Sequence, residues 1–234
     1  MAKTKTIENL FVLLAIFSDI LPILLFAIFF KSIKSKRIIW VLIAFTVFDF
    51  ITNLSLYYFI PPNYHNYIYP VFTLFESLFF AGFFYCTISK AYIRKLILLI
   101  TLIFSICLIG YYFYLFFVIR NIPVLDSIPI GIESILIFIF SFLYFYEQLN
   151  NTSNFFIYSQ ASFWGVLGIL IYLSGSFFIY IFANQISIQE LNKYWIITNI
   201  SSIVKNIFFT VAIYIQANES IKKPPKNYNF YPSN

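Results

Sequence analysis

Ionisable side chains inside long apolar stretches are the residues of this sequence that can do chemistry. Within such stretches lie four acidic residues and one basic residue: Asp19, Asp49, Glu76, Glu133 and Lys205. An ionised side chain at the centre of a bilayer costs at least ~2.5 kcal/mol, so such residues usually face the interior of a helix bundle and have a partner. The acids outnumber the lysine. The sequence therefore predicts either ion pairs that only fix helix packing or a site for a ligand, an ion or a proton.

Counting along the stretches places all five side chains between the midplane and the outer third of the membrane. We therefore expect them to line one polar cavity that opens to the outside. Polar neighbours extend this predicted site, since Asn53 follows Asp49 by one helical turn on the same face. A further polar stripe beside the lysine consists of Asn199, Ser202 and Asn206.

The elements that must position these residues are seven apolar runs, each long enough to cross a membrane, which takes about 20 residues. The runs are approximately Glu8–Phe30, Arg37–Ile60, Tyr67–Ser89, Tyr92–Val118, Asp126–Gln148, Phe155–Ala183 and Leu191–Ala217. Short connections make consecutive helices antiparallel neighbours. The predicted fold is an all-α, polytopic membrane helix bundle of seven transmembrane helices over residues 1–217, followed by a short basic cytoplasmic tail over 218–234.

Basic residues beside the runs predict the orientation of the bundle. If the N-terminus lies outside and the C-terminus lies in the cytoplasm, ten Lys and Arg residues flank the cytoplasmic ends and four flank the outer ends. A cytoplasmic excess of these residues is the rule in membrane proteins. Lys3 and Lys5 argue weakly for the opposite orientation. We expect the N-terminus outside and the C-terminus inside.

Composition excludes several classes of protein. The chain is 61% hydrophobic and 10% charged, whereas soluble domains carry about 25% charged residues. The net charge of +6 comes from short basic clusters between apolar runs, which fits lipid headgroups and excludes a nucleic-acid-binding face. Membrane lipid is therefore an expected partner.

Catalytic and metal-binding motifs are absent from the sequence. The lone histidine, His65, is expected in a solvated loop, and Cys86 and Cys107 lie at depths that differ by roughly 15 Å, too far for a disulfide. A zinc site cannot be assembled from these residues. The sequence also has no GxSxG elbow, P-loop or Gly-rich dinucleotide motif. We expect neither an enzyme nor a bound metal or cofactor.

Glycines gather in the sixth run at Gly165, Gly168 and Gly175, half of the six in the protein. Small residues let helix backbones approach closely, which predicts tight packing at the bundle centre or at an oligomer contact. A conformational hinge is the functional alternative.

A faint internal repeat links the two halves of the chain. The segment Asp19–Ile23 is echoed by Asp126–Ile130, each with a proline three residues after the aspartate, and Trp40 is echoed by Trp164. Such a pattern is typical of a parallel three-plus-one-plus-three repeat, as in SWEET-type sugar transporters. The offsets of 107 and 124 residues differ, which argues against a true repeat.

Three stretches of the chain, which together with the segments between them cover most of it, carry a resemblance to a known group. They are Tyr67–Tyr85, Ile132–Tyr146 and Phe163–Ser176. They resemble an uncharacterised group of small seven-pass integral membrane proteins of Bacteroidota. The resemblance implies a bacterial inner membrane location and no particular activity. It draws attention to Glu76, Glu133 and the segment Ser174–Ser176.

Our leading hypothesis is a receptor-like or sensor membrane protein with an outward-facing polar cavity. Because the tail over residues 218–234 is too short to signal alone, a cytoplasmic or membrane partner protein would dock on the tail or on the Lys31–Arg37 loop. A small-solute or proton-coupled transporter is the alternative from another class, and an accessory subunit of a membrane complex is a third. The sequence does not fix the oligomeric state.

A retinal-binding protein is a further alternative, and it depends on which acidic residue pairs with the lysine. Lys205 can pair with Asp49 or with Glu76, and a pairing with Glu76 would match the Schiff-base lysine and counter-ion of a rhodopsin. The third run, however, lacks the Arg and Trp of microbial rhodopsins, and the sixth lacks their aromatic-and-proline box. These absences disfavour a retinal-binding protein.

Overall fold

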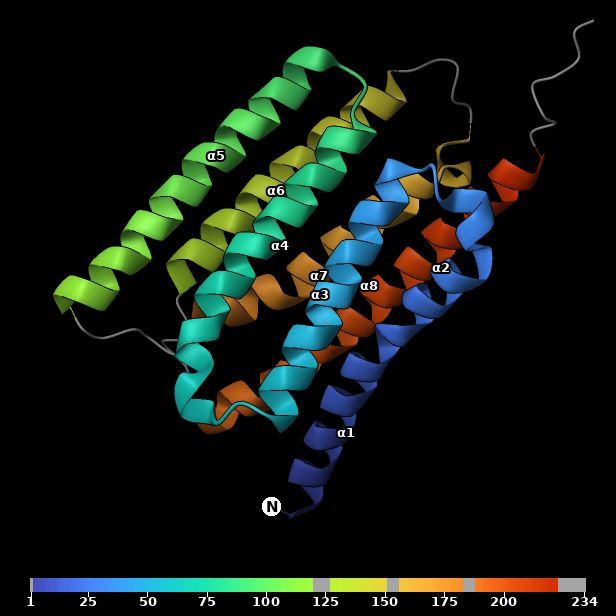
Figure 1. Ribbon diagram of the computed structural model, residues 1–234. Coiled ribbons are helices and arrows are strands. Elements are labelled where there is room, and N and C mark those ends of the chain that lie inside the picture. Colours follow the sequence, from blue (N-terminus) through green and yellow to red (C-terminus); the bar gives the residue numbers. More distant parts are fainter. Residues whose placement is uncertain (1, 120–126, 151–155, 183–187, 223–234) are drawn as a thin grey trace, which may run out of the picture.

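The chain folds into a bundle of α-helices, and the computed structural model describes residues 2–119, 127–150, 156–182 and 188–222 (Figure 1). The α-helices are α1 (Ala2–Ser18), α2 (Ile20–Ile33), α3 (Arg37–Tyr58), α4 (His65–Thr87), α5 (Ala91–Tyr114), α6 (Ser127–Leu149), α7 (Ala161–Phe182) and α8 (Ile188–Lys222). Short helical turns precede α4 at Pro62–Tyr64 and α7 at Ile157–Ser159, and a π-helical turn at Leu115–Ile119 extends α5. None of the described residues forms a β-strand.

Six helical segments are long and apolar enough to cross a membrane, and the described part of α7 adds a shorter apolar stretch, Ala161–Phe177. The six segments are Asn9–Ile33, Arg37–Tyr58, Pro62–Thr87, Ala91–Ile119, Ser127–Leu149 and Tyr194–Glu219. The molecule is therefore an all-helical, multi-pass membrane protein with six or seven spans. The spans lie close to the predicted runs, but three predicted run ends, at residues 126, 155 and 183, lie outside the described residues.

The last helix is longer than the sequence indicated. The predicted bundle ended at Ala217, whereas α8 continues to Lys222, so the first residues of the predicted tail are helical. Residues 223–234 lie outside the described residues.

The first span is broken in its middle. Helix α1 ends at Ser18, Asp19 forms a turn, and α2 begins at Ile20. Proline at position 22 has no N–H, so the carbonyl of Ser18 lacks its usual helical donor. The Ser18 hydroxyl donates to Ala15 O at 2.6 Å. The break brings Asp19 into the core with none of its surface exposed.

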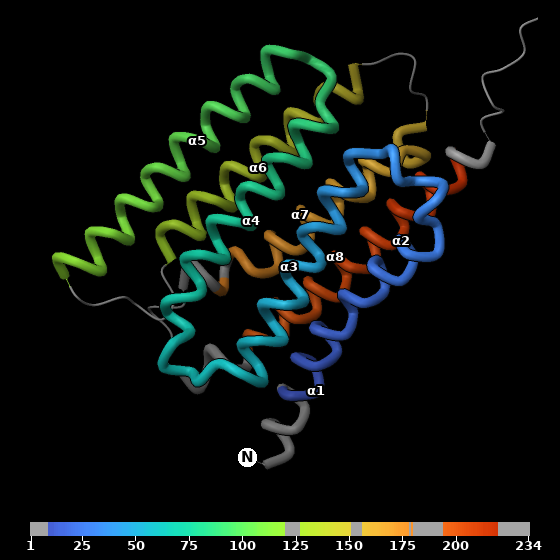
Figure 2. The backbone as a smooth tube through the Cα atoms, in the orientation of Figure 1, coloured from blue at the N-terminus to red at the C-terminus, as the bar shows by residue number. Residues whose placement is uncertain are grey.

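Six spans form a closed ring, and α5 lies outside it. Around the ring, α1 and α2 contact α3, α3 contacts α4, and α4 contacts α6. Helix α6 then contacts α7, and α7 packs extensively on α8. Helix α8 contacts α1 and α2 and so closes the ring. Helix α5 packs mainly on α4 and barely touches α6. Figures 1 and 2 show α5 at the edge of the molecule farthest from α1 and α2. Helix α8 is therefore central, since it contacts α1, α2, α3 and α7.

The two ends of the bundle carry different elements. The N-terminal end is where α1, α4 and α8 begin and α3 ends; the opposite end carries the turns that lead into α3 and α5. Between the level of Lys205 and the opposite end, fully buried rings fill the interior: Phe45, Phe80, Phe83, Phe84, Phe140, Tyr144 and Phe209. This aromatic core closes the half of the bundle beyond the polar residues.

All three glycines of α7 face neighbouring helices. A Cβ atom at Gly168 would lie 3.0 Å from the ring of Phe209 and 3.2 Å from the backbone oxygen of Lys205. One at Gly175 would overlap the hydroxyl of Ser201, and one at Gly165 would clash with the ring of Phe83. Two of the glycines thus let α7 approach α8, and the third approaches α4. The contacts lie inside the bundle.

The two echoed tryptophans make the same local contact. Each is the fourth residue of its helix, Trp40 in α3 and Trp164 in α7. Each donates its indole N–H, at 2.8 Å, to the backbone oxygen six residues earlier, which belongs to Lys34 or Tyr158. The second and sixth spans therefore begin in the same way. The other echoed pair cannot be compared, because Asp126 lies outside the described residues.

Candidate functional site

An ion pair in the middle of the bundle defines the site. Lys205 on α8 is fully buried, and its Nζ forms an ion pair and hydrogen bond with Oδ2 of Asp49 on α3. Oδ1 of Asp19, at the break in the first span, lies 4.0 Å from the same nitrogen. Two carboxylates from separate spans thus flank one ammonium group. These are the only salt bridges among the described residues.

Two aromatic rings complete the surroundings of the ammonium group. The Nζ atom of Lys205 lies 4.8 Å from the ring centroid of Phe45 and 4.7 Å from that of Tyr172. A cation over an aromatic face is attracted by the negative charge of the π system, and the attraction grows when water is excluded. The rings therefore help to stabilise a charge that is buried in an apolar bundle.

Side-chain amides orient both carboxylates. Asn53, one turn from Asp49 on α3, donates to Asp49 Oδ1 at 2.6 Å. Asn206, next to the lysine on α8, donates at 2.7 Å both to Asp19 Oδ1 and to the hydroxyl of Ser18. Each carboxylate is thereby fixed in the position that faces the ammonium group. These bonds join the first, second and last spans into one polar network.

Glu76 adjoins this network through Tyr172. The Tyr172 side chain hydrogen-bonds to the carboxyl group of Glu76, which is 6% exposed and lies within electrostatic range of Lys205 and Asp49. The Oε1 atom of Glu76 has no hydrogen-bond partner among the described residues. Tyr172 therefore contacts the ammonium group with its ring and the third carboxyl with its hydroxyl.

Glu133 lies on the far side of Glu76. It is 1% exposed on α6, close enough to Glu76 for the two carboxyl groups to interact electrostatically. Its Oε1 has no hydrogen-bond partner among the described residues. Beside it, Ser77 and Thr101 border a void of about 10 Å³. Glu133 is thus enclosed between α4, α5 and α6.

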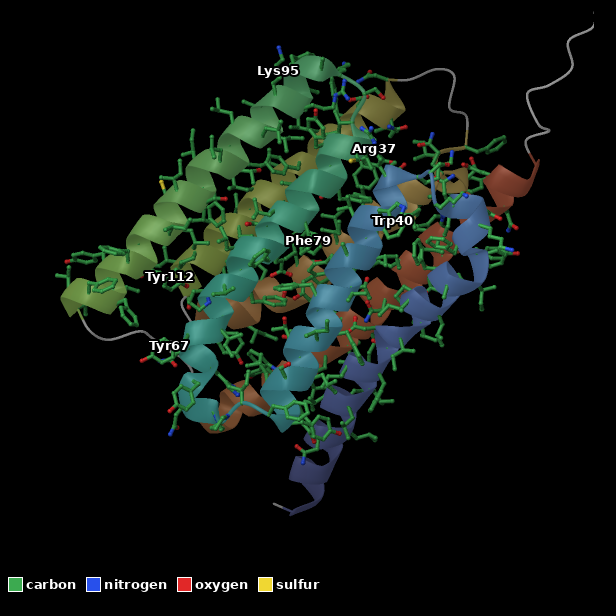
Figure 3. All side chains as sticks on the ribbon, viewed as in Figure 1. Arg37, Trp40, Tyr67, Phe79, Lys95 and Tyr112 are labelled. Carbon is green, nitrogen blue, oxygen red and sulfur yellow. The ribbon has the colours of Figure 1, made fainter. Side chains whose placement is uncertain are left out.

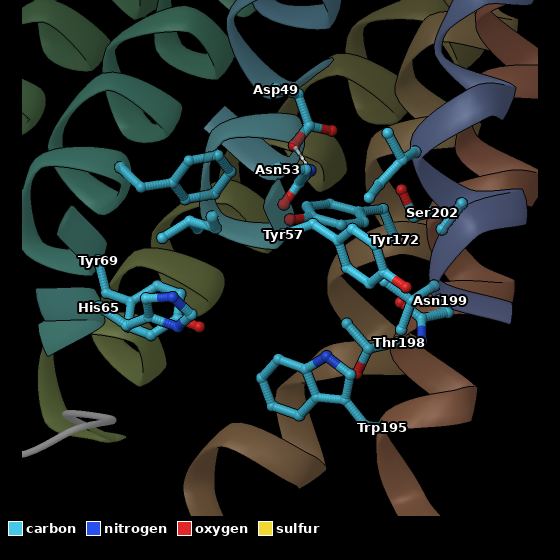
Figure 4. Close-up of a pocket in the computed structure, with 15 residues that line it drawn as sticks. Asp49, Asn53, Tyr57, His65, Tyr69, Tyr172, Trp195, Thr198, Asn199 and Ser202 are labelled. Carbon is cyan, nitrogen blue, oxygen red and sulfur yellow. Dashed lines mark hydrogen bonds between the residues drawn. The ribbon is translucent and has the colours of Figure 1, made fainter. Parts of the chain in front are cut away.

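A cavity of about 220 Å³ leads from the N-terminal end to the ion pair (Figure 4). It is lined by Val12, Ala15, Ile16, Asp49, Asn53, Leu56, Tyr57, His65, Tyr69, Phe72, Tyr172, Trp195, Thr198, Asn199 and Ser202. Tyr57 near its mouth is 39% exposed, whereas Asp49 at its base is 2% exposed. Figure 4 shows Asp49 and Asn53 at one end of the cavity and Trp195 at the other. The cavity therefore connects the ion pair to the N-terminal end.

The cavity contains part of the predicted site. Asp49, Asn53, Asn199 and Ser202 line it. The prediction that all five ionisable residues line one cavity is wrong: Asp19, Lys205, Glu76 and Glu133 do not line it. Depth along a helix can be counted from the sequence, but the direction in which a side chain points depends on how each helix is rotated in the bundle. The lysine pairs with Asp49, so the counter-ion arrangement of a rhodopsin is not formed.

Aromatic and hydroxyl residues of the cavity were missed from the sequence. No sequence pattern distinguished Tyr172 or Thr198 from the other residues, and Tyr is common in this chain, which has 19. Trp195 could have been found, because it precedes Asn199 and Ser202 at the spacing of one helical face. The expectation of a solvated loop for His65 is also wrong, since it is the first residue of α4, half-buried, with Nε2 3.0 Å from Ile60 O.

The arrangement as a whole suits reversible binding. Among the described residues, no three His, Cys, Asp or Glu side chains come together in a way that would hold a metal ion. What the bundle offers is a water-accessible pocket with aromatic, amide and hydroxyl groups on its walls and a buried ion pair at its base. Such concave sites with a few convergent polar groups bind small molecules. Comparison with protein-family models, with curated proteins and with solved structures finds no match for this chain.

Proposed function

We propose that the protein is a receptor-like or sensor membrane protein that binds a small molecule in this cavity. The observation that carries the proposal is the cavity itself, which runs from the N-terminal end to the Asp49–Lys205 ion pair. In the proposed orientation the N-terminus and the cavity face the outside, and the C-terminus lies in the cytoplasm. The resemblance to a Bacteroidota group makes the bacterial inner membrane the proposed location.

Helix α8 is the proposed route from the ligand to the other side of the membrane. It begins at the N-terminal end, lines the cavity with Trp195 and Ser202, carries Lys205 and continues unbroken to Lys222. A ligand that displaced Asp49 would change the surroundings of the lysine, and hence the packing of α8 on its neighbours. The broken first span, which touches the same lysine at Asp19, would respond to the same event.

The distribution of basic residues supports the proposed orientation. Lysines and arginines gather at the end opposite the cavity: Lys31, Lys34, Lys36, Arg37, Lys90, Arg94 and Lys95. Figure 3 shows Arg37 and Lys95 toward one end and Tyr67 and Tyr112 toward the other. Cytoplasmic faces carry such an excess of basic residues, which also suits anionic lipid headgroups. A signalling partner protein would bind on this side, at the short loops or at residues 218–234.

Small molecules that co-purify with the protein test the proposal directly. The protein is purified in mild detergent, and the bound compounds are extracted and identified by mass spectrometry. Ser202→Trp places a large ring in the cavity, while Ile207→Trp, on the lipid-exposed face of the same helix, is the matched control. We expect a compound that is enriched with the wild type and the control and lost with Ser202→Trp. Equal recovery from all three proteins would contradict the proposal.

The sensor step needs its own measurement. Capture of the tagged protein from its native membranes should recover a signalling protein, and this association should be lost when residues 218–234 are deleted or should change when the cavity is filled by Ser202→Trp. If the protein is recovered alone, or its partners are the same for every variant, the sensor part of the proposal fails.

A transporter is the second candidate. The matching indole contacts of Trp40 and Trp164 favour it, because internal repeats underlie alternating access in many transporters. The break at Asp19 also fits, since discontinuous helices form substrate sites in such proteins. Uptake of the co-purified compound into proteoliposomes, driven by a proton gradient and lost in Glu76→Gln, would favour transport. An accessory subunit, the third candidate, would show changes only in the assembly of its complex.

A further inference from the structure

The chemistry of the cavity walls indicates the class of ligand, and we propose that the cavity binds a small organic cation, a molecule that carries an ammonium group. This inference rests on the proposed function, because it requires that the cavity holds a ligand. It is carried by the charges around the cavity, the aromatic rings on its walls and the way in which the protein holds its own lysine.

The described residues around the cavity offer no positive charge to an anionic ligand. Among the described residues, Asp49 and His65 are the only ionisable wall residues besides tyrosines, and His65 Nε2 is engaged with Ile60 O. Directly behind Asp49 lie the side chains of Asp19 and Glu76, together with Lys205, the one buried lysine among the described residues. The lysine is fully buried and held by its carboxylates, so it offers no free charge to a ligand. An anion in the cavity would therefore meet the Asp49 carboxyl group at its base and no available cation among the described residues.

Aromatic side chains provide the surface on which an organic cation binds best. Five rings of the described residues line the cavity: Tyr57, Tyr69, Phe72, Tyr172 and Trp195. They come from four helices, so they surround the space from several sides. Ammonium and alkylated ammonium groups are recognised by such sets of rings through cation–π attraction, for which tryptophan is the best ring.

The protein already holds one ammonium group with the same set of contacts. Lys205 lies between the carboxylates of Asp49 and Asp19 and over the rings of Phe45 and Tyr172. Asp49 and Tyr172 also form part of the cavity wall. Two of the four residues around the internal cation therefore also face a cation that enters the cavity from the N-terminal end.

A hydroxyl group on the cavity wall and the volume of the cavity further restrict the class of ligand. Thr198 lines the cavity, is 7% exposed, and its Oγ1 has no hydrogen-bond partner among the described residues. A polar substituent on the ligand would satisfy this atom. A volume of about 220 Å³ corresponds to roughly seven waters at ~30 Å³ each. The ligand is thus a compact ammonium compound with a polar group, of about the size of choline.

Three probes of one shape and different charge test the class. Choline is the cation, dimethylbutanol (in which carbon replaces the nitrogen) is the neutral isostere, and dimethylbutanoate is the anion. Binding to the purified protein is measured by calorimetric titration and by the shift in unfolding temperature. We expect choline to bind roughly tenfold tighter than the neutral isostere, as a desolvated cation–π and carboxylate contact would give, and the anion not to bind.

Two variants locate the bound probe without touching the ion pair. Trp195→Leu removes one ring from the cavity, and Tyr214→Leu removes a lipid-exposed ring from the same helix as a matched control. Choline affinity should fall about fivefold in Trp195→Leu and remain unchanged in Tyr214→Leu. Equal losses in both variants would place the probe outside the cavity and overturn the inference.

The outcomes separate this inference from the proposed function. If the neutral isostere binds as tightly as choline, or the anion binds best, the ligand class is wrong although the cavity is still a ligand site. If no probe binds but a compound co-purifies and is lost with Ser202→Trp, the charge of that compound decides the class. If no probe binds and no compound co-purifies, both the class and the proposed function are wrong.

Discussion

Two buried acidic regions of the bundle differ in what surrounds them. On one side, Asp19 and Asp49 flank Lys205, each carboxylate receives an amide hydrogen bond, and a cavity reaches Asp49 from the N-terminal end. On the other side, Glu133 is enclosed by α4, α5 and α6, with one oxygen atom unpartnered among the described residues and a void of only about 10 Å³ beside it. Both regions would be expensive to bury as charges.

The difference between the two regions indicates which buried acid can take part in ligand binding. A buried acid becomes part of a binding site when solvent or ligand reaches it and when neighbouring groups fix its geometry. Asp49 meets both conditions, whereas the void beside Glu133, of about 10 Å³, is too small to admit a ligand. Acidic residues that look equivalent in the sequence therefore play different parts in the folded bundle.

The largest effect is expected from breaking the Asp49–Lys205 pair. Asp49→Asn leaves the ammonium group with only Asp19, at 4.0 Å, and should lower the free energy of unfolding by about 3 kcal/mol, as is usual when one partner of a buried pair is lost. Denaturation in detergent, followed by circular dichroism, measures this change. The double variant Asp49→Asn with Lys205→Met should recover part of the loss, and a double variant less stable than either single one would show that the pair is not what matters.

A smaller effect is expected at Glu147, which lies near the end of α6, about four turns beyond Glu133 on the same helix. The Glu147 carboxylate accepts hydrogen bonds from the backbone N–H of Ser89 at 2.7 Å and of Lys90 at 3.5 Å, and so holds the turn that leads into α5. Glu147→Ala should lower the free energy of unfolding by about 1 kcal/mol, the usual net value of a lost hydrogen bond. Hydrogen exchange should rise selectively at Ser89 and Lys90. A uniform rise throughout the bundle would contradict this local role.

The smallest effect is expected at Glu133 itself. Because the described residues give its Oε1 no partner, Glu133→Gln should change the free energy of unfolding by less than about 0.5 kcal/mol. It should also leave choline binding unchanged, in contrast to Asp49→Asn. A loss of stability as large as that of Asp49→Asn would remove the distinction between the two regions, and a loss of choline binding would extend the site to α6.

Most of the helical architecture could be predicted from the sequence. Apolar runs such as Arg37–Ile60 correspond closely to a helix, because a span requires about 20 apolar residues whatever its neighbours are. The break at Asp19 has a local cause in the sequence, because Pro22 has no N–H to continue the helix. The candidates Asp49, Asn53, Asn199 and Ser202 were also found, since polar residues stand out in such a hydrophobic chain.

The pairing and the cavity could not be predicted in the same way. Asp49 and Lys205 are 156 residues apart, and the choice between Asp49 and Glu76 as the partner depends on how α3, α4 and α8 are rotated toward one another. Tyr172 joins the site because the glycines of α7 bring that helix against α8. The sequence alone determined a multi-pass helical bundle with a few buried polar residues, because hydrophobicity and proline act locally. Only the tertiary structure decided which of those residues meet and which one the cavity reaches, because helix packing sets where each side chain points.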